Sequence, residues 1–130
     1  MREKFVQDSI VKWLQGKQYV IHRVTDKVHG IDIKAYNNAR HYYFIECKGE
    51  TKGENSNLDF STAMGQILLR MVAGKDSWKS YCIGIPDIRE FTNQYAKFLK
   101  LPLQFRKQLK ISFFFVDASG SVVKKDSWLK

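Results

Sequence analysis

Apolar positions recur along much of the chain every three or four residues, the period of a helix with one buried face. In the first such segment, apolar residues from Phe5 to Leu14 are interleaved with charged and polar ones, and Gly16 follows as a stop signal. In the second, Asp59 stands where an N-cap is expected and Gly74 where the helix should end. Helices are therefore predicted over residues 2–15, 59–73 and 89–100, with a short continuation of the last to about residue 107.

Runs of aromatic and β-branched residues between polar turns predict the strands. Asn37 and Asn38 tolerate left-handed backbone, so the strands on either side of them are expected to form an antiparallel hairpin. The polar stretch 51–58 predicts a loop. Strands are predicted over residues 19–24, 31–36, most of 41–50, 81–86 and 111–116, with a last edge strand at 122–123.

The order of these elements predicts an α/β fold. A helix and three strands are followed by a helix, a strand, a helix and a final strand, which favours a mixed central sheet flanked by helices. The hairpin comes first and helical crossovers follow it. No repeat or linker divides the 130 residues, so residues 1–130 are expected to form one domain large enough to bury a core.

The composition excludes a disordered chain and favours a polyanionic partner. Hydrophobic residues make up 44% of the chain and aromatic residues 14%, which is more than disordered segments carry. An excess of Lys and Arg over Asp and Glu gives a formal net charge of +9, which favours nucleic acid ahead of a membrane surface. Solubility alone would also explain such an excess.

No segment predicts export or membrane insertion. The N-terminal residues 2–4 are all charged, and the longest apolar run, around residues 113–116, is far shorter than a membrane span. Cys47 and Cys82 lie in apolar segments and lack the spacing of a zinc site or a disulfide framework. We therefore expect a cytoplasmic protein with no membrane partner and two reduced, buried thiols.

A pair of opposite charges ends the third predicted strand. Residues two apart in a strand point to the same face, so Glu46 and Lys48 should stand side by side with Cys47 on the other face. Asp32 interrupts the apolar strand across the hairpin. A loop of residues 37–41 would place Asp32 opposite Glu46, whereas a loop one residue shorter would send the two carboxylates to opposite faces. The pattern leaves this register open.

Two neighbouring carboxylates repel each other, and a divalent cation relieves that repulsion. Carboxylate ligands with positions left for water suit Mg²⁺ or Mn²⁺, and such an ion activates water and stabilises charge on a phosphate. Lys48 would then orient the attacking water or offset charge on the phosphoryl oxygens. In a basic protein these features predict a phosphodiester hydrolase. A solvated strand end with a surface ion pair is the simpler alternative.

The segments Gly30-Ile31-Asp32 and Glu46-Cys47-Lys48 resemble the PD-(D/E)XK nuclease superfamily, which has a restriction-endonuclease-like αβββαβ core. The resemblance implies that a C-terminal helix and strands are additions to that core. It also implies that Asp32, Glu46 and the backbone carbonyl of Cys47 bind Mg²⁺, and that Lys48 serves the nucleophilic water. Ile31 departs from the family pattern, which has proline at that position.

The resemblance extends over residues 3–86. It implies supporting catalytic roles for Glu3 in the first helix, with Asp8 as a competing position, and for Gln66 in the second helix. Arg70 stands one turn later, where the family often has tyrosine, and we expect it to face solvent, although contact with phosphate is an alternative. The segment 59–71 also resembles small superfamily members found with mobile elements, including excision-controlling factors.

Other candidate residues have simpler interpretations. Tyr42 and Phe44 are expected to pack in the core rather than to stack on bases. His29, just before Gly30, is expected to be a loop residue, although it could approach the site. A basic strip that serves either phosphate binding or solubility is predicted from Lys97, Lys100, Arg106, Lys107 and Lys110.

These observations predict a Mg²⁺-dependent deoxyribonuclease, with Mn²⁺ as a substitute ion and DNA as partner. The alternative from a different class is a nucleic-acid-binding module on the same fold, with cleavage absent or dependent on a partner subunit. A basic interaction protein with no nucleic-acid role is a third interpretation. A homodimer would supply the two sites that cutting two strands requires, but no surface in the sequence identifies one.

Overall fold

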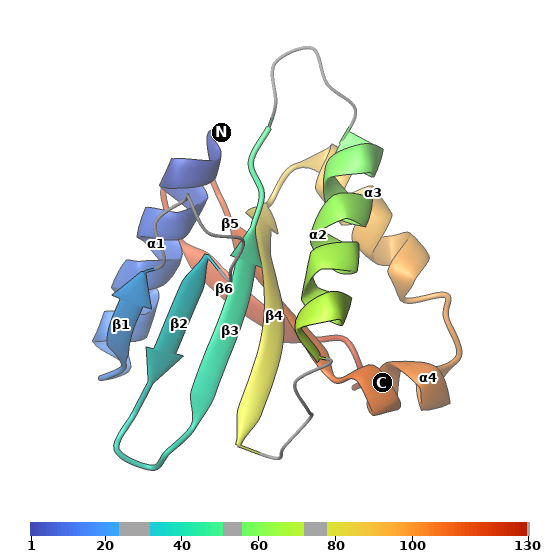
Figure 1. Cartoon of the computed structure of the whole chain (residues 1–130). Coiled ribbons are helices and arrows are strands. Elements are labelled where there is room, and N and C mark those ends of the chain that lie inside the picture. The colour runs from blue at the N-terminus through green and yellow to red at the C-terminus, as the bar shows by residue number, and fades with distance from the viewer. Residues whose placement is uncertain (24–31, 51–55, 72–77, 130) are drawn as a thin grey trace.

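A six-stranded sheet runs through the chain in the order β1-β2-β3-β4-β5-β6 (Figure 1). The computed structural model describes residues 1–23, 32–50, 56–71 and 78–129. Each strand is hydrogen-bonded to the strands before and after it in the sequence, so the sheet has no crossed connections. The strands are β1 Val20–Arg23, β2 Ile33–Tyr36, β3 Tyr42–Cys47, β4 Lys79–Pro86, β5 Ile111–Val116 and β6 Val122–Asp126.

The sheet is mixed, as the sequence predicts. β1, β2 and β3 pair antiparallel, β3, β4 and β5 pair parallel, and β6 pairs antiparallel with β5. Parallel neighbours require a crossover, and the helices between β3 and β5 provide both crossovers. The helices are α1 Glu3–Gly16, α2 Ser56–Arg70, α3 Arg89–Phe98 and α4 Leu103–Leu109. The predicted αβββαβ order and its C-terminal additions are therefore confirmed.

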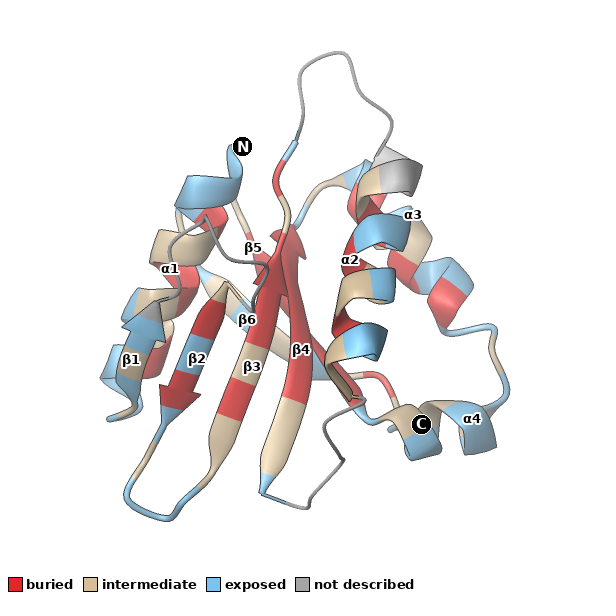
Figure 2. Ribbon diagram, in the orientation of Figure 1, coloured by how far each residue is buried: buried red, intermediate tan, exposed pale blue. Residues whose placement is uncertain are grey.

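Two apolar clusters lie on the opposite faces of the sheet. α1 packs Val6, Ile10 and Leu14 against one face, while α2 and α3 pack against the other (Figure 1). β5 and most of β4 are buried because both faces are covered, which explains their largely apolar sequence (Figure 2). β2 alternates between buried and exposed residues because only its α1 face is covered.

A close approach of α1 to the sheet depends on a glycine in β4. A β-carbon at Gly84 would collide with the end of the Ile10 side chain and lie 3.2 Å from the sulfur of Cys47. Glycine therefore leaves room for the Ile10 side chain of α1 to pack directly on β4.

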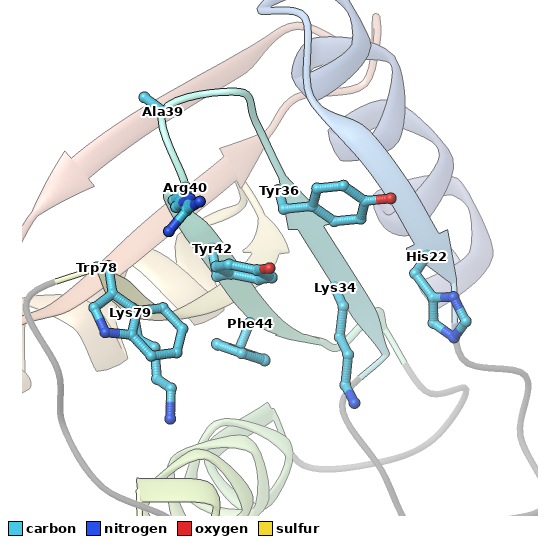
Figure 3. Close-up of a pocket in the computed structure, with 9 residues that line it drawn as sticks. All are labelled: His22, Lys34, Tyr36, Ala39, Arg40, Tyr42, Phe44, Trp78 and Lys79. Carbon is cyan, nitrogen blue, oxygen red and sulfur yellow. The ribbon is translucent and has the colours of Figure 1, made fainter.

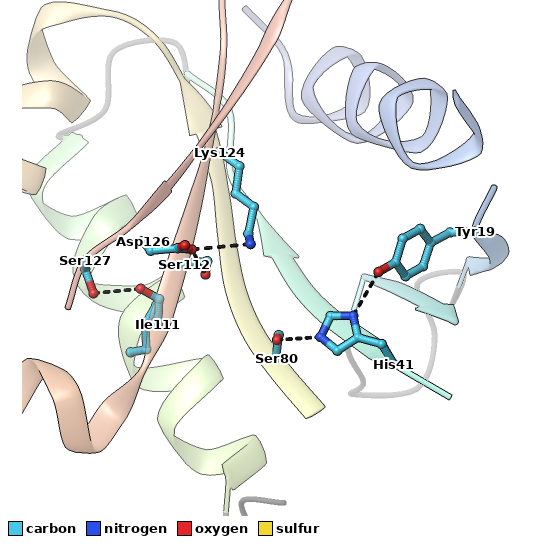
Figure 4. A network of polar contacts seen from close by, with 8 residues as sticks. All are labelled: Tyr19, His41, Ser80, Ile111, Ser112, Lys124, Asp126 and Ser127. Carbon is cyan, nitrogen blue, oxygen red and sulfur yellow. Dashed lines mark hydrogen bonds and ion pairs between the residues drawn. The ribbon is translucent and has the colours of Figure 1, made fainter. Parts of the chain in front are cut away.

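A polar network on the α1 side ties the hairpin to its neighbours (Figure 4). The two ring nitrogens of His41 contact the Tyr19 hydroxyl at 2.9 Å and the Ser80 hydroxyl at 2.8 Å. Burial, followed by the charge of Lys124, lowers the pKa of His41, so a neutral ring bridges the residue before β1 to β4. Ser112 donates to Asp126 at 2.7 Å and links β5 to β6 in the same way.

Several predicted boundaries were wrong by a few residues. α2 begins at Ser56, so the predicted loop is shorter and Asp59 lies in the first helical turn rather than at the N-cap. α2 ends at Arg70, and the predicted stop at Gly74 lies outside the described residues. β6 extends to Asp126 because it pairs along the length of β5. None of the described helices is both long enough and apolar enough to cross a membrane.

Candidate functional site

The hairpin register, which the sequence leaves open, places Asp32 beside the end of β3. Ile33 pairs with Ile45 and Tyr36 pairs with Tyr42, so the same alignment continued by one residue sets Asp32 opposite Glu46. The loop between the strands is closed by hydrogen bonds between Asn37 and the segment that ends at His41. This is the longer of the two loops considered from the sequence, and it brings both carboxylates to one face.

Asp32 caps the hairpin with its side chain. Its carboxylate oxygen Oδ2 accepts a hydrogen bond of 2.8 Å from the backbone N–H of Cys47. The next N–H, that of Lys48, points the other way and donates to the carbonyl of Gly84 at 2.9 Å. Because the N–H and C=O of one extended residue point to the same strand edge, we expect the Cys47 carbonyl to lie on the Asp32 side.

Glu46 is a buried carboxyl group whose protonation is coupled to Asp32. Only 2% of the residue is exposed. The pKa of Glu46 is raised to about 7, first by burial and then by the neighbouring charge of Asp32 and a hydrogen bond between the two carboxyl groups. The charges of Arg70 and Lys48 act in the opposite direction. At neutral pH the Glu46 carboxyl group is therefore poised between its protonated and charged forms.

Arg70 lies beside Glu46. The sequence predicts that its side chain faces solvent, and that prediction was wrong. Its Nε atom is 3.7 Å from Oε1 of Glu46, which makes an ion pair but exceeds hydrogen-bond distance. Those two atoms and Oε1 of Gln66 are buried without a hydrogen-bond partner in the part of the chain that the structure describes. Buried polar atoms are rarely left in that state, so the site has capacity for a further ligand.

Glu3 reaches the site because the backbone after β3 crosses the start of α1. A β-carbon at Gly49 would lie 2.7 Å from the α-carbon of Glu3, so only glycine permits the crossing. Next to it, the backbone N–H of Glu50 donates to the carbonyl of Met1 at 2.7 Å, and the N-terminal ammonium pairs with the Glu50 carboxylate. These contacts anchor the N-terminus of α1 against the end of the hairpin.

The electrostatics place Glu3, rather than Asp8, at the site. Partial burial raises the pKa of Glu3, the charge of Asp32 raises it further, and the charge of Lys48 lowers it. Gln7 donates to the Glu3 carboxylate at 3.2 Å and holds it in place. Asp8 instead pairs with Lys4 at 3.7 Å.

Asp59 is a further acidic residue that sequence reasoning did not assign to the site. It lies in the first turn of α2, and its charge raises the pKa of Glu3, so it acts electrostatically on the site. In the sequence, the one notable feature of Asp59 was its position near the predicted start of the helix. That position suggested capping, so the role could not be inferred without the spatial arrangement.

Some predicted residues lie elsewhere. His29 and Gly30 are outside the described residues. Arg106 donates to the carbonyls of Leu101 at 3.0 Å and Ser127 at 2.6 Å, so it fixes the C-terminal segment and is no part of an exposed basic strip. The other predicted members of that strip, Lys97, Lys100, Lys107 and Lys110, are exposed.

The residues present fit a hard divalent cation. The described chain holds no group of three His, Cys, Asp or Glu side chains ready to bind a metal. Asp32 and Glu46 nevertheless supply two adjacent carboxylates, and an oxygen of Glu46 has no hydrogen-bond partner. Mg²⁺ is commonly bound by one or two carboxylates and several waters, so this donor set with the Cys47 carbonyl is sufficient.

Solved structures share this fold. An XisH family protein from Nostoc punctiforme PCC 73102 superposes with a TM-score of 0.61 at 16% sequence identity, covering 92% of this chain and 96% of that one. A FdxN element excision controlling factor protein from Anabaena variabilis gives a TM-score of 0.59 at 17% identity, with the same coverage of 92% and 96%. No protein-family model matches the sequence. No curated protein matches it. At these identities the likeness establishes the fold.

Proposed function

We propose that this protein is a metal-dependent nuclease of the PD-(D/E)XK superfamily that hydrolyses phosphodiester bonds in DNA. The observation that carries the proposal is the convergence of the Asp32 and Glu46 carboxyl groups at the end of the hairpin. Burying a carboxyl group against another carboxylate costs free energy through desolvation and charge repulsion. A protein rarely keeps such an arrangement unless it serves a function. Such perturbed groups are typical of functional sites.

The residues around the pair would have separate roles. Asp32, Glu46 and the Cys47 carbonyl would hold Mg²⁺ or Mn²⁺, which supplies charge neutralisation and a lowered pKa of bound water. Lys48 would donate a hydrogen bond to the attacking water or to a phosphoryl oxygen. Water attacks phosphorus in line, the bond to the leaving oxygen breaks, and that oxygen takes a proton.

Glu3 and Gln66 would support the metal-binding residues and Lys48 without binding the metal themselves. Glu3 lies close enough to Asp32 and Lys48 to affect and be affected by their charges, so it would help to orient the lysine and the water. The buried Oε1 of Gln66 lacks a hydrogen-bond partner in the described structure, so its amide could bind a water or a phosphate oxygen.

Two further observations support nucleic acid as the substrate. The formal net charge of +9 favours a polyanion. One protein with the same fold carries the name FdxN element excision controlling factor, which refers to the excision of an element. Both are compatible with a nuclease that acts on DNA in the cytoplasm.

Cleavage of a supercoiled plasmid in Mg²⁺ or Mn²⁺ tests the proposal. We expect Asp32→Ala and Lys48→Ala to abolish cleavage while circular dichroism remains that of the wild type. Glu90→Gln, which removes an exposed carboxylate from the first turn of α3, is the matched control and should cleave normally. Cleavage that persists in either site variant would refute the assignment.

A second function is favoured by the ion pair between Arg70 and Glu46. An arginine already placed against a metal-binding carboxylate would suit a module that binds nucleic acid and cuts only with a partner subunit, or not at all. The word "controlling" in the name of the similar protein points the same way. Salt-sensitive DNA binding without cleavage in either metal ion would select this function.

A further inference from the structure

A hollow of about 730 Å³ lies on the same sheet face as Glu46, over the opposite half of the hairpin (Figure 3). Four aromatic residues line it, namely Tyr36, Tyr42, Phe44 and Trp78. The hollow is wide and shallow rather than enclosed, since Tyr36 is 41% exposed and Trp78 is 44% exposed. Large aromatic groups left this accessible are typical of a binding surface.

The rings form an ordered platform. Tyr36 and Tyr42 stand opposite each other in the hairpin and stack with ring centroids 5.7 Å apart and planes inclined by 30°. Tyr42 also stacks on Phe44, at 6.3 Å and 13°. Trp78 meets the edge of Tyr42 at 5.3 Å. Phe44 packs against the core as the sequence predicts and also lines the hollow, whereas Tyr42 is half-buried and lines the hollow without joining that core cluster.

Positive charge surrounds these rings. Lys34, Arg40 and Lys79 line the hollow, and no Asp or Glu is among its described lining residues. The ammonium group of Lys79 lies 4.7 Å from the centre of the Trp78 ring. The hollow therefore combines flat apolar surfaces with cations, which is the chemistry that recognises bases and phosphates together.

The hollow and the candidate site lie on the same face of β3. Tyr42, Phe44 and Glu46 alternate onto the same face of the strand. At about 3.3 Å per residue, Tyr42 and Glu46 are about 13 Å apart along β3. A nucleic-acid strand a few nucleotides long could therefore occupy the hollow while a phosphate of the same strand lies at Asp32 and Glu46.

The platform favours unpaired bases. In a duplex the base faces are stacked on each other and unavailable, whereas in a single strand each base can stack on an aromatic side chain. We propose that this hollow binds a single-stranded nucleic-acid segment next to the phosphodiester bond at the Asp32–Glu46 site. This inference rests on the proposed nuclease for the position of the bond, and it goes beyond that function by specifying an unpaired strand.

Binding can be measured without cleavage. The protein would carry Asp32→Ala and be kept in EDTA, and the probes would be a fluorescently labelled oligothymidine and a labelled duplex of equal length. We expect the single strand to bind more tightly than the duplex. Trp78→Ala or Tyr36→Ala should weaken single-strand binding about 5- to 100-fold, the effect of losing one stacked base. Both side chains are exposed, so these variants should remain folded.

Matched variants separate stacking from general charge. Phe105→Ala removes an aromatic residue of similar exposure, 45%, from α4 outside the hollow and should bind as the parent does. Trp78→Phe should restore most of the affinity that Trp78→Ala loses. Lys34→Ala and Lys79→Ala should each reduce the slope of log affinity against log salt concentration by about one, the value of one phosphate contact. Lys107→Ala should leave that slope unchanged.

The outcomes distinguish the two proposals. Single-strand binding that depends on Trp78, together with a wild type that cleaves nothing in Mg²⁺ or Mn²⁺, would retain the hollow and reject the nuclease. If the wild type cleaves DNA but the Trp78→Ala and Tyr36→Ala proteins bind the single strand normally, the hollow is not the binding site for single strands. A third outcome is that the duplex binds as tightly as the single strand, with Trp78→Ala and Tyr36→Ala weakening the binding of both probes equally. That result would overturn the inference that the hollow selects unpaired bases.

Discussion

Replacing Glu46 with glutamine should stabilise this protein at neutral and alkaline pH when no divalent cation is present. Glutamine keeps the shape of the side chain and removes its charge. Glu46 is 2% exposed and its pKa is raised from 4.5 to about 7, first by burial and then by Asp32. The native protein therefore holds a proton on this carboxyl pair that the unfolded chain has already released.

The sign and size of the effect follow from linkage. Below pH 4.5 the carboxyl group is protonated in both states and contributes no difference. Between pH 4.5 and about 7 the native state binds more protons than the unfolded state, so the free energy of unfolding falls as pH rises. Each pKa unit is worth about 1.4 kcal/mol, so the loss in the wild type approaches about 3 kcal/mol above pH 7. Glu46→Gln abolishes this loss.

Urea unfolding followed by tryptophan fluorescence measures the prediction. In EDTA, Glu46→Gln and the wild type should have similar stabilities at pH 4, and the variant should be more stable by up to about 3 kcal/mol at pH 8. Saturating Mg²⁺ should remove most of this difference, because a ligand present at 100 times its dissociation constant stabilises the wild type by about 2.7 kcal/mol. The exposed Glu90→Gln serves as the control and should show neither effect.

Two results would refute this reasoning. A stability difference between Glu46→Gln and the wild type that does not change between pH 4 and pH 8 would mean that the Glu46 carboxyl group is not perturbed in solution. Equal stabilisation of both proteins by Mg²⁺ would mean that Glu46 does not bind the ion. The first result would undermine the described geometry, and the second would undermine only the proposed metal site.

Three further predictions test other parts of the structure. Gly49→Ala should destabilise the protein by about 1–3 kcal/mol in urea, because its β-carbon would meet the backbone at Glu3, whereas Gly65→Ala, with nothing within 4 Å, should be neutral or stabilising. Arg70→Ala should cost about 1–2 kcal/mol at pH 8 and much less at pH 4, where Glu46 is uncharged; an equal cost at both values would contradict the ion pair. Both cysteines are fully buried, so a thiol reagent should label neither in the native protein and both in urea, and rapid native labelling would contradict the packing of the sheet.

The sequence predicts the fold well because either the period or the length of each apolar segment identifies the element. β5 shows why: the apolar run 111–116 is long enough for a buried strand and too short for most helices, and it forms that strand. The start of α2 was less certain because Asn55, Ser56, Asn57 and Asp59 are all residue types that favour the N-cap position. The predicted start of this helix at Asp59 was therefore three residues too late.

The candidate site was only half predictable. Asp32, Glu46 and Lys48 could be identified because charges at the ends of apolar strands require an explanation. Their convergence depended on the length of one loop, which sequence does not determine. Arg70 was missed because an arginine beside an apolar stripe usually faces solvent, and only the packing of α2 on β3 turns it toward Glu46.

Side chains of β3 alternate between the two faces of the sheet, which explains why the candidate site and the hollow share a face. Odd-numbered residues 43–47 are buried beneath α1 and hold the strand in place, while even-numbered residues 42–48 point toward α2. α2 packs over β3 and β4, so β1 and β2 expose side chains on that face. A slip of one residue in the hairpin would exchange the two sets and bury Glu46 and Lys48 under α1. The apolar contacts of the odd-numbered residues therefore fix the register on which the carboxylate pair depends.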